Sequence, residues 1–504
     1  MEHKWTLLNE HTQEQIDNLS KELNVSKAIA KVMLNRGISD RDKANQFFRI
    51  SIDQLYDPFL MRDMEQAVDR IERALKNNEK IFIYGDYDVD GITSVSMMVL
   101  AFKELGKTVG FYIPDRLREG YGLSKTGIYE AAAEGYSLII SVDCGITAIE
   151  EVQLACSLGI DVIICDHHEP GNQLPPAAAI LNPKRHDCEY PFKELAGVGV
   201  AYKLLQALFI HYELPHERLH RFAELVAIGS AADIVPLIDE NRIFAKIGLE
   251  RLAQSENLGI QALLDATGLR NKTIGTGQVV FIIAPRINAV GRLGDAERAV
   301  RLLTTENIQQ ARNIAAILEK ENRQRKSIDE ETFKEALKII EQDIDLNRQR
   351  SIVINLEDWH PGVIGIVASR IVEKFYRPTI MISTDNGIGK GSARSIPGFD
   401  LYRALCKCSD YMLGFGGHKY AAGLKIDTSK LDAFKQKFES IAREWIEDDA
   451  LIPQLRIDSE IRLGDIDRTF LNILQHFGPF GPQNMRPVFM ATKLQIMGTP
   501  TIVG

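Results

Sequence analysis

The chain has 504 residues, of which 45% are hydrophobic and 26% are charged, and its formal net charge is -9. This length is enough for about three domains with cores of their own. An acidic chain is not a general nucleic-acid-binding surface, so a polyanion would need a local basic channel. Part of the acidic excess could serve as metal ligands.

The six cysteines, at 144, 156, 165, 188, 406 and 408, lack the paired spacing of a disulfide framework or a zinc site. They are typical of buried thiols in a reducing compartment. The first residues lack the apolar run of a signal peptide, and no stretch approaches 18 apolar residues. We therefore expect a cytoplasmic protein that does not contact a membrane.

Helical periodicity over residues 12–48 predicts a small N-terminal helical region, residues 1–50. From residue 79 the pattern changes to strands that alternate with helices. Strands are expected at 81–85, 108–113, 138–142 and 161–165, with a helix over 93–105. This rhythm predicts an α/β fold with a largely parallel sheet and helices on both faces.

Acidic and imidazole side chains follow several of these strands. Asp86, Asp88 and Asp90 come after the first strand, Asp143 after the third, and Asp166, His167 and His168 after the fourth. Asp233 follows an apolar helical stretch. Because parallel strands bring their carboxyl ends to one edge of a sheet, these side chains are expected to meet there.

A calcium loop is the main competing interpretation of Asp86-Tyr-Asp88-Val-Asp90-Gly91. Its twelfth position should be a bidentate Glu but is Met97, and a strand precedes it instead of a helix. Carboxylates with one or two imidazoles suit Mn²⁺ or Mg²⁺. Two such ions about 4 Å apart are a common apparatus for hydrolysing phosphate esters, which is the chemistry that the cluster predicts.

The remaining chain predicts a long charged helix and a second α/β unit. The helix covers 305–345. Strands are expected at 351–355 and 378–383, and helices at 362–375 and 430–446. Two glycine-rich stretches, 387–395 and 414–418, are either flexible turns or backbone cradles for a phosphate.

Taken together, the ordered motifs resemble those of the DHH phosphoesterase superfamily, and within it the RecJ-like exonucleases. They are Asp86-Tyr-Asp88-Val-Asp90-Gly91, Val142-Asp143-Cys-Gly145, Asp166-His167-His168 and Ala232-Asp233-Ile-Val-Pro236. The resemblance covers nearly all of the chain past residue 50. It implies a DHH catalytic domain at 51–304, a linker helix at 305–345, a smaller DHH-associated nucleic-acid-binding domain at 346–449, and the start of an incomplete OB-fold at 450–504.

The resemblance also implies roles for individual residues. Two divalent cations, Mn²⁺ or Mg²⁺, would be held by Asp88, Asp90, Asp143, His167 and Asp233, with Asp143 as the bridge. Asp86, Asp166 and His168 would be catalytic or would orient the ligands. DNA would be bound by Arg116, Arg286, Asn288, Arg292, His360, Ser392, Arg394, Gly417 and His418, with Arg116, Ser392 and Arg394 on the 5′-phosphate.

The function that the resemblance implies is metal-dependent 5′-to-3′ exonuclease activity on single-stranded DNA, releasing 5′-mononucleotides in repair and recombination. A DHH phosphodiesterase of short oligonucleotides or cyclic dinucleotides is the nearer alternative. A non-catalytic nucleic-acid scaffold is the farther one. Expected partners are single-stranded DNA with a 5′ end, a single-strand-binding protein and a helicase.

Overall fold

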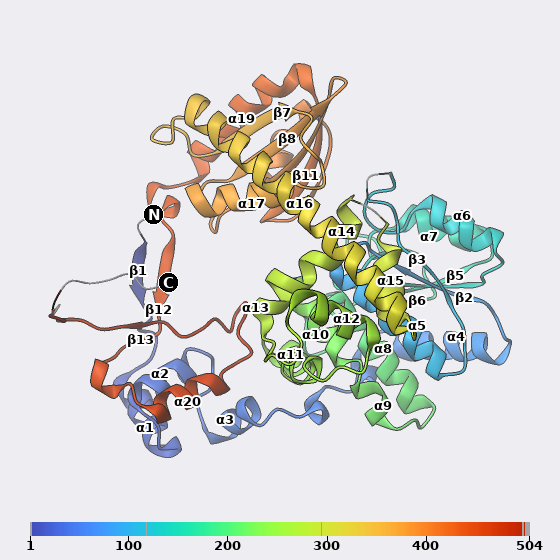
Figure 1. Cartoon of the computed structure of the whole chain (residues 1–504), viewed down its shortest axis with the longest axis horizontal. Coiled ribbons are helices and arrows are strands. Elements are labelled where there is room, and N and C mark those ends of the chain that lie inside the picture. Colours follow the sequence, from blue (N-terminus) through green and yellow to red (C-terminus); the bar gives the residue numbers. More distant parts are fainter. Residues whose placement is uncertain (1–2, 117, 294, 496–497, 499–504) are drawn as a thin grey trace. The chain divides into compact units, whose positions relative to one another are not determined.

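A computed structural model describes residues 3–116, 118–293, 295–495 and 498. The chain divides into two compact units, one made of residues 9–322 and 458–504 and the other of residues 1–8 and 323–457 (Figure 1). No helix within the described residues is both long enough and apolar enough to cross a bilayer.

The larger unit is organised around a parallel sheet with the strand order β3-β2-β4-β5-β6. These strands are β2 (Ile81–Gly85), β3 (Gly110–Tyr112), β4 (Leu138–Val142), β5 (Asp161–Cys165) and β6 (Ala179–Leu181). Three of the four predicted strands coincide with β2, β4 and β5, whereas β3 is shorter than predicted and β6 was missed. Strand order reverses between β2 and β4, which is where open α/β sheets form a crevice.

Alternate residues of the sheet enter two separate cores. Ile81 and Ile83 pack with α4 (Met64–Lys76), α5 (Val89–Glu104) and α8 (Gly197–His211). Phe82 and Tyr84 pack on the opposite face with α6 (Lys125–Ala133) and α7 (Ile149–Ser157). Both faces of the sheet are therefore covered, as the nearly continuous apolar strands require.

Further helices of this unit extend the first of these cores. They are α9 (His216–His220), α10 (Ala223–Ala232), α11 (Asp239–Leu252), α12 (Leu258–Thr267), α13 (Thr276–Gln278), α14 (Ala284–Leu293) and α15 (Glu297–Thr304). A π-helical turn, η3 (Val279–Ile283), leads into α14. The stretch around Arg286 has little apolar periodicity, and it is nevertheless a helix because it packs against this core.

The N-terminal helices are α1 (Gln13–Leu23), α2 (Lys27–Leu34) and α3 (Arg41–Phe48). Each begins at a side-chain cap, Thr12, Ser26 or Asp40 respectively. Their apolar faces share a core with Phe470 of α20 (Arg468–His476) and with Phe477. The C-terminal segment also contributes two short parallel strands, β13 (Ser459–Glu460) and β14 (Phe489–Met490).

The smaller unit holds a mixed sheet with the order β10-β11-β9-β8-β7. These strands are β7 (Ile352–Glu357), β8 (Thr379–Asp385), β9 (Ile388–Arg394), β10 (Met412–Gly417) and β11 (Ala421–Asp427). On one face pack α18 (Leu401–Cys406) and α19 (Leu431–Trp445), and on the other pack α17 (Ile364–Phe375) and the C-terminal half of α16 (Ile308–Asp343). The predicted long helix and second α/β unit are thus present.

One element of the N-terminal region differs from the prediction of helices alone. Residues Lys4–Leu7 form β1, which pairs in parallel with β12 (Gln454–Ile457) in the smaller unit. A four-residue strand with one partner carries too little periodicity to be recognised from sequence.

Candidate metal and phosphate sites

The acidic motif after β2 is fixed by the first turn of α5. Asp88 is the N-cap of this helix, and its Oδ1 accepts hydrogen bonds from the N–H groups of Asp90 (2.9 Å) and Gly91 (3.2 Å). A Cβ at Gly91 would lie 2.4 Å from the carbonyl oxygen of Asp86, so only glycine permits this approach. The helix therefore begins at Val89, earlier than predicted, and Asp90 lies in its first turn.

Asp90 is tied to a second helix terminus. Its Oδ2 accepts a hydrogen bond from the N–H of Gly197 at 2.7 Å, and its Oδ1 accepts one from Val198 at 2.9 Å. These are the first amides of α8, where a negative charge is favoured. Burial and the charge of Asp88 nevertheless raise the pKa of Asp90 to about 7.

Asp143 and Asp233 reach the same place from β4 and α10. Asp143 has a left-handed backbone with φ 61°, and Asp233 caps the end of α10. Burial, together with the charges of Asp90 and Asp88, raises the pKa of both carboxyls well above the usual range. Three carboxyls thus repel one another in a largely buried setting, which opposing cations would relieve.

His167 completes this group. Its Nε2 lies 3.2 Å from Asp143 Oδ1, 3.6 Å from Asp233 Oδ2 and 3.9 Å from Asp90 Oδ2. Burial and the charge of His168 lower the pKa of His167 to about 3, which keeps the ring neutral. A neutral imidazole is the form that binds a metal.

The ligand atoms fit a divalent cation. His167 Nε2, Asp143 Oδ1 and Asp86 Oδ1 are buried, and none has a hydrogen-bond partner within the described residues. Two groups of three side chains could each hold an ion, because within each group one ligand atom per residue lies within 4.8 Å of the others. The groups are Asp143, His167 and His168, and Asp90, His167 and Asp233. The first group offers one carboxylate and two imidazoles, and the second offers two carboxylates and one imidazole. Together with the nearby acidic side chains, these donors suit Mn²⁺ or Mg²⁺. Asp88 and Asp86 belong to neither group, although the charge of Asp88 acts on both.

Asp166 contacts both histidines, and its Oδ1 lies 2.8 Å from Nδ1 of His168. Its Oδ1 accepts hydrogen bonds from the backbone N–H of His167 (2.7 Å) and of His168 (3.1 Å), and its Oδ2 accepts one from Ile146 (2.9 Å). Burial opposes ionisation, but the hydrogen bond with the His168 ring lowers the pKa of Asp166 to about 2. The same contact outweighs the burial of His168 and raises its pKa to about 9.

Tyr121 is a residue at this site that the sequence prediction missed. Its hydroxyl donates a hydrogen bond to the carbonyl oxygen of Asp143 at 2.8 Å and lies 3.0 Å from His168 Nδ1. The flanking residues Gly120 and Gly122 both have left-handed backbones, with φ 88° and 87°. The Gly-Tyr-Gly pattern was the available signal, because two such glycines fix a side chain at the tip of a loop.

The predicted DNA-binding residues of the larger unit have different settings. The Arg116 guanidinium lies 4.9 Å from the ring centre of Tyr87, beside Asp86. Arg286 is held by Glu319 (Nε to Oε2, 2.6 Å) and by the carbonyl oxygen of Ile282. Asn288 is partly buried in α14, and the side chain of Arg292 lies outside the described residues. The expected aperiodic stretch is therefore a helix, in which Arg286 already has an ion-pair partner.

In the smaller unit, Ser392 and Arg394 lie together on β9. Arg394 Nη1 donates to Ser392 Oγ at 3.2 Å. A Cβ at Gly365 would lie 2.8 Å from Ser392 Oγ and 3.0 Å from Arg394 Nη2, so both side chains lie against the first turn of α17. An arginine and a hydroxyl at a helix N-terminus form a site suited to phosphate. His360, just before α17, accepts a hydrogen bond at Nδ1 from Gly362 N–H at 3.1 Å.

The two glycine-rich stretches are strands rather than phosphate-cradling loops. The backbone of β9 pairs with β8 on one side and β11 on the other, so its amides are largely used within the sheet. Gly417 is explained by the β10–β11 hairpin, since a Cβ there would lie 2.4 Å from the carbonyl oxygen of Ala421. His418 N–H donates to that same oxygen at 2.8 Å. Phosphate contact in this unit would fall to side chains.

Models of three known domain families match successive parts of the chain. The DHH family N-terminal domain matches residues 80–230, the DHHA1 domain matches 349–444, and the RecJ OB domain matches 457–504. The chain is 42% identical to the single-stranded-DNA-specific exonuclease RecJ of Bacillus subtilis, over 94% of this chain and 60% of that protein. It is 38% identical to the RecJ of Dickeya dadantii, over 92% of this chain and 82% of that protein.

A solved structure gives the same result. The RecJ of Thermus thermophilus in complex with Mn²⁺ matches with a TM-score of 0.85 and 30% identity, over 97% of this chain and 69% of that one. The chain thus spans 60% of the length of the Bacillus subtilis relative and about 69% of the solved Thermus chain.

Proposed function

Because the chain belongs to the RecJ family of single-stranded-DNA-specific exonucleases, we propose that it hydrolyses single-stranded DNA from the 5′ end and releases 5′-mononucleotides, with Mn²⁺ or Mg²⁺ as cofactor. The observation that carries this proposal is the convergence of Asp90, Asp143, His167 and Asp233 from separate elements. When bound, two divalent cations would activate water and stabilise charge on the phosphoryl oxygens.

The residues of the chain have separate tasks in this reaction. Asp88, Asp90, Asp143, His167 and Asp233 would hold the cations, and Asp143 is suited to bridge them. Asp166 and Tyr121 fix the ring of His168. With a pKa of about 9, His168 is protonated at neutral pH and could supply a proton to the departing 3′-oxygen.

The 5′ end would be recognised by its phosphate. The proposed phosphate contacts in the smaller unit are Ser392 and Arg394, which lie on β9 against the start of α17. The proposed contact in the larger unit is Arg116. Attack of water on the next phosphorus breaks its bond to the 3′-oxygen, so the shortened strand keeps a new 5′-phosphate. Each turnover therefore regenerates the group that these residues would bind.

The partners and location follow from the same reaction. A helicase would supply unwound DNA, and a single-strand-binding protein would keep it open. All six cysteines are free, which is compatible with a cytoplasmic, reducing setting.

A substrate panel tests the proposal. A 3′-labelled, 5′-phosphorylated single strand, its duplex form and a cyclic dinucleotide are each incubated with Mn²⁺, Mg²⁺ or chelator. We expect metal-dependent release of mononucleotides from the single strand alone. Cleavage of the cyclic dinucleotide only, or strand binding without metal-dependent turnover, would replace the proposal with one of the two alternatives.

A further inference from the structure

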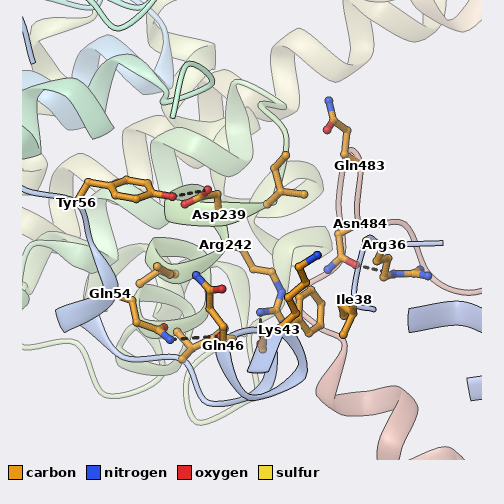
Figure 2. A pocket seen from close by; sticks show the side chains of 15 residues that line it. Arg36, Ile38, Lys43, Gln46, Gln54, Tyr56, Asp239, Arg242, Gln483 and Asn484 are labelled. Atoms are coloured by element: carbon orange, nitrogen blue, oxygen red, sulfur yellow. Dashed lines mark hydrogen bonds between the residues drawn. The ribbon is translucent and has the colours of Figure 1, made fainter. Parts of the chain in front are cut away.

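The larger unit contains a cavity of about 380 Å³ that shares no residue with the acidic edge. It lies where α3, the start of α11 and the segment around Asn484 come together (Figure 2). A cavity of this size is in the range that holds small-molecule ligands, about 300–1,000 Å³. It is too small for a folded partner.

The lining combines an apolar wall with carboxamides. Ile38, Phe47 and Ile243 contribute apolar surface. Gln46, Gln54 and Gln483 contribute side-chain amides, which both donate and accept hydrogen bonds. A flat ligand with donors and acceptors along its edge, such as a nucleobase, fits this combination.

The charge of the lining is positive. The lining holds three cationic side chains, Arg36, Lys43 and Arg242, and one carboxylate, Asp239. The Asp239 carboxylate accepts a hydrogen bond from the Tyr56 hydroxyl at 3.0 Å. Arg36 is balanced by Asp458 at 3.2 Å, outside the lining. Lys43 lies exposed on α3, where its Nζ donates to Ser39 Oγ and its charge acts on the nearby carboxylate of Asp40.

Arg242 is the most unusual of these cations. It is 4% exposed, and its guanidinium lies 3.6 Å from the ring centre of Phe47. It donates to the backbone carbonyls of Phe47, His476, Phe477 and Gly478, and no carboxylate pairs with it within the described residues. Its Nε has no hydrogen-bond acceptor there. A buried cation without a counter-ion favours an anionic occupant.

We propose that this cavity binds a nucleoside 5′-monophosphate, with the base against the apolar wall and the carboxamides and the phosphate toward Lys43 and the arginines. The inference rests on the proposed function, because such nucleotides are the products of that reaction. It adds a second nucleotide site, separate from the hydrolytic one.

The cavity is linked to the acidic edge by a short connection. Only residues 234–238 separate Asp233 from Asp239 of the lining, and Ile234 and Asp239 both have left-handed backbones, with φ 62° and 46°. Leu237 N–H donates to the carbonyl oxygen of Pro482, next to Gln483, at 2.8 Å. A ligand that contacts Asp239 and Gln483 therefore acts on both sides of the segment that carries Asp233. Nucleotide and Mn²⁺ should then change each other's affinity by the same factor.

The experiment measures binding of a deoxynucleoside 5′-monophosphate to the full chain by calorimetry in chelator. Arg394→Ala is the background, so that the proposed 5′-phosphate site does not contribute. Lys43→Glu removes the rim cation, and Gln46→Trp, at an exposed position of α3, fills the mouth of the cavity. Lys21→Glu makes the same charge change on α1, away from the lining.

We expect one bound nucleotide, with affinity weakened about tenfold or more by Lys43→Glu and by Gln46→Trp and unchanged by Lys21→Glu. The unphosphorylated nucleoside and inorganic phosphate should each bind at least about tenfold more weakly. Adding Mn²⁺ should shift the nucleotide affinity in the Arg394→Ala background but not when Gln46→Trp is added to it.

Several results would overturn the proposal. The first is a nucleotide affinity that neither Lys43→Glu nor Gln46→Trp changes. The second is inorganic phosphate that binds as tightly as the nucleotide, and the third is an acidic peptide that occupies the cavity in preference to the nucleotide. Hydrolysis of single-stranded DNA without added nucleotide is measured separately. A chain that hydrolyses DNA but fails the binding test loses only the second site, whereas one that binds nucleotide but hydrolyses nothing loses the proposed function.

Discussion

The acidic edge of the larger unit and the Ser392–Arg394 pair of the smaller unit are assembled in different ways. At the acidic edge, Asp90, Asp143, His167 and Asp233 come from α5, β4, β5 and α10, so the order of the strands places them together. Ser392 and Arg394 are two residues apart on one strand, and they share a face because side chains alternate along it.

Before any ligand binds, the two sites also differ in how well their polar groups are paired. The acidic edge holds buried carboxyls that repel one another, and two of its ligand atoms, Asp143 Oδ1 and His167 Nε2, have no hydrogen-bond partner in the described chain. Arg394 already donates to Ser392 and to the carbonyl oxygen of Ala393. Cations should therefore stabilise the larger unit strongly, whereas phosphate should have a small effect on the smaller one.

The largest expected effect comes from Asp143→Asn. Loss of a bridging charge should reduce metal-dependent hydrolysis by more than about 100-fold, beyond the usual effect of a group that only orients a ligand. In chelator the same change should raise the free energy of unfolding by about 1–2 kcal/mol, because folding no longer has to desolvate or protonate a carboxyl whose pKa is raised by burial. Activity assays and denaturant titration measure the two results. Unchanged activity would remove Asp143 from the site.

Gly197→Ala tests the packing of the acidic edge without altering a ligand. A Cβ there would lie 2.6 Å from Asp143 Oδ1, so the carboxylate must move. We expect Mn²⁺ affinity, measured by calorimetry, to fall about 10- to 100-fold. Gly277→Ala is the matched control, because a Cβ at Gly277 meets no atom within 4 Å. Equal affinities in the two variants would contradict the geometry described.

Arg394→Ala tests the phosphate pair. It should reduce the preference for 5′-phosphorylated over 5′-hydroxyl strands about tenfold through KM, since a charge-assisted hydrogen bond is lost. Lys390→Ala, at an exposed position of the same strand, is the control. If the preference for the 5′-phosphate survives Arg394→Ala but is lost in Lys390→Ala, then Lys390 recognises the phosphate and the assignment to Arg394 is wrong.

The smallest effect is a dependence of stability on pH. The pKa values of Asp90, Asp143 and Asp233 are raised in the fold, so the folded chain holds these protons more tightly than the unfolded chain does. This difference stabilises the folded chain at low pH. That contribution is lost as pH rises through about 7, the pKa of Asp90. In chelator, Tm should therefore fall by a few degrees between pH 6 and 8.

With Mn²⁺ the trend should weaken, because the cation favours the ionised carboxylates. The gain in Tm on adding Mn²⁺ should thus be larger at pH 8 than at pH 6. An equal gain at pH 6 and pH 8 would show that these carboxyls are already ionised in the fold without metal, and it would contradict the raised pKa values.

The convergence at the acidic edge could be predicted from sequence because each candidate ligand follows an apolar strand or helix that has a clear pattern. β2, β4 and β5 were located to the residue, and a parallel sheet then requires Asp86, Asp143 and His167 to share an edge. The Gly-Tyr-Gly pattern indicates a loop that presents Tyr121, but its contact is not readable from sequence, since its hydroxyl donates to the backbone carbonyl of Asp143 in another loop.

The smaller unit was predicted less accurately for a physical reason. Glycines in β9 and β10 look like a loop in the sequence. In β9, Gly389 and Gly391 are required because neighbouring side chains leave no space for a Cβ, whereas in β10 only Gly417 is confined, by the backbone of Ala421. A Cβ at Gly391, for example, would lie 2.8 Å from Leu424. Similarly, α14 lacks clear periodicity because Arg286 lies partly buried in its ion pair with Glu319, which is distant in sequence.

The most direct test of the metal site is to count and locate Mn²⁺ by anomalous diffraction from crystals of the full chain. Two ions are predicted, both within coordination distance of Asp143 and sharing Asp88, Asp90, His167 and Asp233 as the other protein ligands. Ions bound elsewhere, or ligand side chains that leave the edge when Mn²⁺ is present, would contradict the account.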